Sequence, residues 1–142
     1  MAIIKTESFE LAVYARGDMA SPKRAIVIPG RLDTKGYIHN TSLVDYLATQ
    51  GYYALSCDPP GTWESPGDIS LFSTTSYLKA VTELIAHFGN KPTVLLGHSR
   101  GGATAMLASM SHPSIVAIVV MLANFGPPSS PKDTTKQRGF EL

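Results

Sequence analysis

A chain of 142 residues with 44% hydrophobic side chains can bury one sizeable core, so a single domain is expected. The balance of 12 basic and 11 acidic side chains gives a formal net charge of +1, which argues against charge-driven binding of nucleic acid or a membrane surface. No stretch reaches the roughly 18 apolar residues of a membrane-spanning helix, and charge interrupts the N-terminus before a signal-peptide core. Because the single cysteine, Cys57, fits a reducing compartment, we expect a cytoplasmic protein.

Strand-like and helix-like segments alternate along the chain. Two segments with strand composition come first, and every later strand is separated from the next by a segment with helical spacing of its apolar residues. Apolar strands that alternate with helices predict a mostly parallel sheet with helices on both faces, the α/β class. The expected strands are 8–17, 21–30, 52–58, 91–97 and 114–123, and the expected helices are 40–51, 73–89 and 101–113.

The stretch "VLLGHSRGGATA" places Ser99 on a turn between a strand and a helix. A G-x-S-x-G pattern arises by chance in roughly one chain in ten of this composition, so the structural context carries the argument. A sharp turn here would raise the Ser99 side chain above the carboxyl end of the sheet, beside the N–H groups of a helix N-terminus. Gly97 and Gly101 are expected because a larger side chain would collide with the neighbouring strand or helix. The alternative is a tight turn in another doubly wound protein, with Ser99 serving only as a helix cap.

Three segments in order resemble the α/β-hydrolase fold family, and they cover roughly residues 25–125. "VIPGRLDTKG" is similar to the family's oxyanion loop, with Pro29 in place of the usual histidine and Gly30 retained. "CDPPGTWESPGD" resembles the loop after the fourth strand, although Trp63 stands where a second glycine is usual. "GHSRGG", which includes His98, matches the nucleophile elbow in full.

The resemblance implies a serine hydrolase of the carboxylesterase, lipase or thioesterase type, with Ser99 as the nucleophile. It also implies an oxyanion hole formed by the backbone N–H groups of Arg31 and Arg100. The substrate would be a small ester-type molecule, and no cofactor or metal is implied. Trp63 is a candidate wall of the acyl pocket, or equally a residue that only fills its loop.

In this family the catalytic acid and histidine follow the nucleophilic serine in the sequence, and this chain offers few candidates for either role. His112 lies 13 positions beyond Ser99 on the same predicted helix, about 20 Å away. His98 is expected to point away around the turn, and only His39, after the oxyanion loop, could approach the site. Asp133 is a weak candidate for the acid. Asp58, Asp68 and Cys57 are interpreted as structural, and no His, Cys or Asp cluster has metal-ligand spacing in the sequence.

The sequence also stops short of the family's last two strands. We interpret residues 1–125 as the N-terminal part of a hydrolase core, and residues 126–142 as a Pro/Ser-rich tail or the start of a cap. A sheet truncated there would leave an apolar edge uncovered. Such a chain would be inactive or incomplete alone, or would be completed by a second chain or a homo-oligomer. The alternative function is a non-catalytic protein or fragment that binds a small hydrophobic ligand.

Overall fold

The structure, a computed structural model, describes residues 2–122. Within this range the strands and helices follow the predicted alternation, with one additional short strand at the start. The strands are β1 Ala2–Lys5, β2 Glu10–Arg16, β3 Arg24–Ile28, β4 Tyr53–Cys57, β5 Thr93–His98 and β6 Ile115–Met121. The helices are α1 Ile38–Thr49, the single 3₁₀ turn η1 Ile69–Leu71, α2 Thr74–His87 and α3 Arg100–Ser109.

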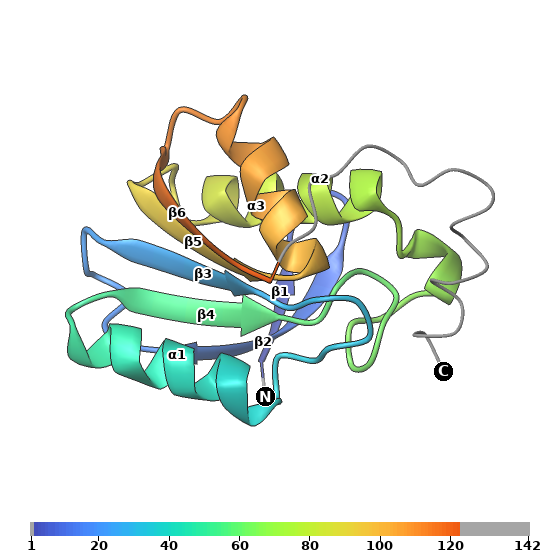
Figure 1. Cartoon of the computed structure of the whole chain (residues 1–142), viewed down its shortest axis with the longest axis horizontal. Helices are drawn as coiled ribbons and strands as arrows, with labels where there is room; N and C mark the ends of the chain where they lie inside the picture. Colours follow the sequence, from blue (N-terminus) through green and yellow to red (C-terminus); the bar gives the residue numbers. More distant parts are fainter. Residues whose placement is uncertain (1, 123–142) are drawn as a thin grey trace.

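The strands form one mixed sheet in the order β1-β2-β4-β3-β5-β6. The pairs β1/β2 and β2/β4 are antiparallel, whereas β4, β3, β5 and β6 run parallel to one another. Because parallel neighbours need crossover connections, α1, α2 and α3 fall between the parallel strands and cover the sheet (Figure 1). This confirms the predicted α/β class and the mostly parallel sheet.

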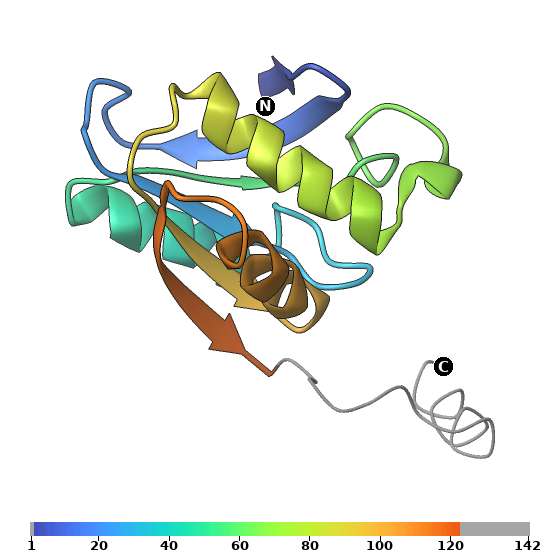
Figure 2. The same ribbon diagram turned by 90° about the horizontal axis from the view of Figure 1, so that it is seen from above.

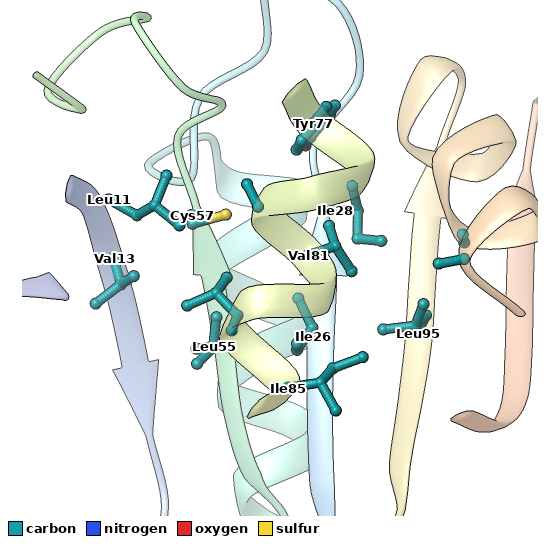
Figure 3. Packing of buried hydrophobic residues seen from close by; sticks show 14 of the residues in the cluster. Leu11, Val13, Ile26, Ile28, Leu55, Cys57, Tyr77, Val81, Ile85 and Leu95 are labelled. Atoms are coloured by element: carbon teal, nitrogen blue, oxygen red, sulfur yellow. The ribbon is translucent and has the colours of Figure 1, made fainter. Parts of the chain in front are cut away.

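The two faces of the sheet bury different amounts of apolar surface. Successive residues of a strand point to opposite faces, so in β3 Ile26 and Ile28 face α2 and α3, whereas Ala25 and Val27 face α1. Seen from above, α2 and α3 lie in front of the strands and α1 lies behind them (Figure 2). The larger cluster lies under α2, whose Val81 and other buried residues rest on the strands (Figure 3).

Helix α1 begins earlier than the sequence predicts. The cap-type residues from Asn40 onward suggest a start at position 40, but the helix starts at Ile38, with Tyr37 in the N-cap position. Asn40 is buried inside the first turn, where its Nδ2 donates to the Thr34 carbonyl oxygen at 2.8 Å. Asn40 therefore ties α1 to the preceding loop. In α2, by contrast, Ser73 caps the helix by accepting the Ser76 N–H at 3.0 Å.

Strand β6 is the last strand of the sheet within residues 2–122, and one side of it is open. Val116 is 63% exposed and Val119 is 45% exposed, although the segment is apolar throughout. On the adjoining helix α3, Met106 and Leu107 are also exposed. The apolar edge that the sequence predicts is therefore present. In the described part of the chain, no helix is long and apolar enough to cross a membrane.

Cys57 ends β4 inside the main core, as its interpretation as a small core residue requires. Burial, reinforced by the nearby Asp58 charge, raises the pKa of its thiol to about 12. At pH 8 only about one molecule in ten thousand then carries the thiolate, the form that reacts. We expect a thiol reagent such as DTNB to leave the native protein unmodified and to titrate one thiol in guanidinium chloride. A rapid reaction of the native protein would contradict this assignment.

Candidate active site

Ser99 occupies a strained backbone conformation at the point where β5 meets α3. Its φ of 53° and ψ of −117° lie outside the regions that non-glycine residues readily adopt. Its N–H donates to the Met121 carbonyl oxygen of β6 at 2.8 Å, and its own carbonyl oxygen accepts the Gly102 N–H at 2.9 Å. Both sides of the strained residue are therefore held by hydrogen bonds, which is how a fold maintains such a conformation.

The two glycines of the motif are required by close packing of the backbone. A Cβ on Gly97 would strike the Gly101 carbonyl group of α3, and a Cβ on Gly101 would strike the Ile28 carbonyl oxygen at the end of β3. The Pro29 carbonyl oxygen would also lie only 2.7 Å from a Gly101 Cβ. The predicted reason for both glycines is thus confirmed. Their small size brings α3 close to the sheet, directly beneath Ser99.

The Ser99 hydroxyl is not used as a helix cap. Ser99 stands in the N-cap position of α3, yet its side chain makes no capping hydrogen bond to that helix. The residue is also only partly buried. These facts disfavour the interpretation of Ser99 as a structural cap, because a capping serine accepts a hydrogen bond from the second or third N–H of its helix.

The proposed oxyanion donors lie on the two segments that meet at the elbow. Arg100 is the first residue of α3, where N–H groups have no acceptor within the helix. Its guanidinium donates to Thr74 Oγ1 at 2.9 Å and lies over the Phe72 ring, 4.9 Å from the centroid. Arg31 is exposed on the loop after β3, and the buried Tyr77 hydroxyl anchors that loop by donating to the Pro29 carbonyl oxygen at 2.8 Å.

The other histidines and the candidate acid do not complete a triad in the described part of the chain. His87 is exposed at the end of α2. His112 was expected on the helix that follows Ser99, but α3 ends at Ser109 and His112 lies past it, where its Nδ1 accepts the Ser114 N–H at 3.3 Å. Between residues 2 and 122, no histidine is hydrogen-bonded to Ser99. Asp133 lies outside the described residues.

His98 and His39 meet at Asp33, a residue that the sequence analysis does not single out. His98 Nδ1 and His39 Nε2 each lie 3.3 Å from Asp33 Oδ2, and the two imidazole centroids are 5.6 Å apart. The same oxygen also accepts the Gly30 N–H, at 3.3 Å. His98 thus contacts Asp33 and His39, and it is not hydrogen-bonded to Ser99 within the described residues. The sequence shows no metal-ligand spacing, but the fold brings together three side chains that could hold an ion.

A cavity of about 170 Å³ opens beside these loops. It is bounded by the loop after β3, by the loop after β4 and by η1. Trp63 lines it and is held at a positive φ of 48°, in a loop position where the resembled family has glycine. The lining residues are Leu32, Asp33, Pro59, Gly61, Thr62, Trp63, Ile69 and Phe72.

A buried ion pair joins the same two loops. Asp58, which is fully buried, accepts from Lys35 Nζ at 2.8 Å, from the Lys35 N–H at 2.9 Å and from Thr34 Oγ1 at 2.7 Å. Lys35 Nζ also contacts the Glu64 carboxylate. Burial lowers the pKa of Lys35, but the hydrogen bonds to Asp58 and Glu64 outweigh this effect, so the pKa is raised overall. These contacts support the structural interpretation of Asp58.

Comparison with known proteins agrees with this geometry. The model of the alpha/beta hydrolase fold family matches residues 26–142, so the chain belongs to that family. A 2-hydroxy-6-oxononadienedioate/2-hydroxy-6-oxononatrienedioate hydrolase from a Pseudomonas species is 32% identical over 79 residues, which cover 56% of this chain and 28% of the relative.

Solved structures share the fold at low identity. The thioesterase domain of the curacin biosynthetic pathway superposes with a TM-score of 0.77 at 19% identity, covering 99% of this chain and 52% of that structure. Epoxide hydrolase A from Mycobacterium thermoresistibile gives a TM-score of 0.78 at 18% identity, covering 98% of this chain and 44% of that structure. The chain therefore spans about half of these structures and little more than a quarter of the Pseudomonas relative.

Proposed function

We propose that this chain carries the nucleophile of a serine hydrolase that cleaves an ester or thioester through an acyl-enzyme on Ser99. The observation that carries the proposal is the strained turn at Ser99, with a hydroxyl that does not cap α3. A strained backbone at a serine whose hydroxyl makes no capping hydrogen bond is typical of a catalytic nucleophile. Membership of a hydrolase family supports the same conclusion.

In the proposed reaction, Ser99 Oγ attacks the carbonyl carbon of the substrate as its proton passes to a base. The bond to the alcohol or thiol then breaks, the leaving group takes up the proton, and water later hydrolyses the acyl-enzyme. The backbone N–H groups of Arg31 and Arg100 would stabilise the tetrahedral oxyanion, a contribution of roughly 3 to 4 kcal/mol for one donor.

Among residues 2–122, none is placed to act as the base or the acid of this mechanism. His39 and His98 are both engaged with Asp33, while His87 and His112 belong to other regions of the fold. We therefore propose that the chain alone is inactive or incomplete, and that the triad is completed by further residues or by a second chain. The alternative is a non-catalytic protein that binds a small hydrophobic ligand, favoured by the cavity that Leu32, Trp63 and Phe72 line.

A fluorophosphonate probe tests whether Ser99 is a nucleophile. An oxyanion hole retains part of the reactivity of a serine that lacks its base, so we expect slow labelling of the wild-type chain at Ser99. Ser99→Ala should lower the signal by at least about 100-fold, because the attacking oxygen is removed. Ser42→Ala is the matched control, since Ser42 is an exposed serine on α1, and it should label like the wild type. Peptide mass spectrometry identifies the labelled residue.

The same assay separates the alternatives when protein concentration is varied. Labelling per chain that is independent of concentration supports a site contained in one chain. Labelling per chain that rises steeply with concentration supports completion by a second copy. No labelling at any concentration contradicts the hydrolase proposal and leaves the ligand-binding alternative.

A further inference from the structure

We propose that Asp33, His39 and His98 form a binding site for a divalent transition-metal ion of the zinc type. The three residues come from the loop after β3, the first turn of α1 and the end of β5. Each offers one ligand atom, and these atoms all lie within 4.8 Å of one another. Two imidazoles and one carboxylate are a donor set that suits zinc and its neighbours among the transition metals.

Two of the three separations between the donor atoms match the spacing of ligands around a single ion. Ligand atoms about 2.0 to 2.1 Å from a tetrahedral ion are separated by roughly 3.3 Å. Both imidazole nitrogens lie 3.3 Å from Asp33 Oδ2. Hydrogen bonds from nitrogen to oxygen centre near about 2.9 to 3.0 Å and are shorter when a partner is charged. The two contacts are therefore at the long end for hydrogen bonds and also of ligand-to-ligand length. The two imidazole nitrogens lie within 4.8 Å of each other and would move together around an ion.

The surroundings of Asp33 resemble the outer shell of a metal site. The Gly30 N–H points at Asp33 Oδ2 from 3.3 Å and so helps to orient the carboxylate. Gly30 also leaves the necessary room, because a Cβ there would lie 3.3 Å from both Asp33 Oδ2 and His98 Nδ1. The Gly30 backbone therefore closes one side of the three side chains, and the partly exposed histidines leave the other side open to solvent.

An ion could enter and exchange from the solvent. The side chains of His39 and His98 are 47% and 32% exposed, whereas Asp33 is 18% exposed. Three protein ligands leave a fourth tetrahedral position for water or another ligand, as in zinc sites that are not purely structural. Bound there, the ion would join the loop after β3 to the strand that precedes Ser99. This inference does not depend on Ser99 being a nucleophile.

Isothermal titration of the tag-free, chelator-treated chain with Zn²⁺ tests the proposal. We expect one equivalent to bind, with the affinity lowered by more than about 100-fold in His39→Gln, because a direct ligand is lost. The exposed His87 is the matched control, and His87→Gln should bind Zn²⁺ like the wild type. Far-UV circular dichroism of the variants establishes that they are folded.

Thermal unfolding supplies a second readout that needs no enzyme activity. Excess Zn²⁺ should raise the Tm of the wild type and of His87→Gln by several degrees, and should leave the Tm of folded His39→Gln unchanged. Asp33→Asn should behave like His39→Gln. Absence of stoichiometric binding in the wild type, or equal binding by His39→Gln, would overturn the proposal, whatever the outcome of probe labelling at Ser99.

Discussion

Gly101→Ala is expected to lower the free energy of unfolding by about 3 kcal/mol or more and to abolish probe labelling at Ser99. The new methyl group would strike the Ile28 carbonyl oxygen and would lie 2.7 Å from that of Pro29. Overpacking of a closed site costs about 1 to 3 kcal/mol, and a rigid backbone obstacle places this position at the upper end. A domain of this size has only about 5 to 15 kcal/mol of stability in total, so the loss is severe.

The effect on labelling follows from where the collision occurs. Gly101 is in the first turn of α3, so relief of the clash moves that turn away from β3 and carries Ser99 with it. A displacement of about 1 Å can reduce reactivity by about 100-fold. Urea unfolding and fluorophosphonate labelling measure the two effects. The control is Gly36→Ala, because a Cβ at exposed Gly36 meets nothing nearer than 3.9 Å. Equal behaviour of the two variants would contradict the close-packing argument.

The fold and the elbow could be predicted because their signals are local. The spacing of apolar residues predicts α2, and Ser73 marks its start. Gly97 and Gly101 flank Ser99 within five residues, so the strand, the turn and the helix are visible in one short stretch. Local pattern and global fold agree at these positions, as expected of a sequence that specifies one structure.

The features that could not be predicted depend on contacts between distant residues. Strand β1 is four residues long and exists through its pairing with β2. Asn40 looks like a helix cap, but burial against Thr34 places it inside α1. Asp33 lies 65 residues from His98, and only the parallel pairing of β3 with β5 brings their ends together. The spacing of residues in the sequence therefore does not indicate that Asp33 and His98 lie side by side.

Asp58→Ala is expected to destabilise the fold by about 3 to 5 kcal/mol, the largest effect of any change in the loops around the site. Removal of one partner of a buried ion pair leaves the other charge without compensation. Here the remaining group is Lys35, whose side chain is 6% exposed and would keep only the contact with the exposed Glu64 carboxylate. Three further donors lose their acceptor: the Lys35 N–H, the Thr34 hydroxyl and the Glu64 N–H.

The second partner of Lys35 offers the matched control. Glu64 contacts the same ammonium, but its side chain is 57% exposed, so solvent screens the interaction. Glu64→Gln should therefore cost no more than about 1 kcal/mol. Urea unfolding at pH 8 compares the variants under conditions in which Lys35 is charged. Because the pKa of Lys35 is raised in the fold, its contribution is full below the ordinary value of 10.5 and is lost only as the pH rises past the raised value.

A double substitution separates the loss of an ion pair from the loss of packing. If the cost in Asp58→Ala comes from the poorly compensated ammonium, then replacing Lys35 with methionine in the same chain should recover part of it, because no buried charge remains. The three donors would still lack an acceptor, so recovery should be incomplete. A double variant no more stable than Asp58→Ala would show that Asp58 acts through the loop backbone rather than through Lys35. The loops that line the cavity would then be held by hydrogen bonds to one carboxylate, with the charge of its partner contributing little.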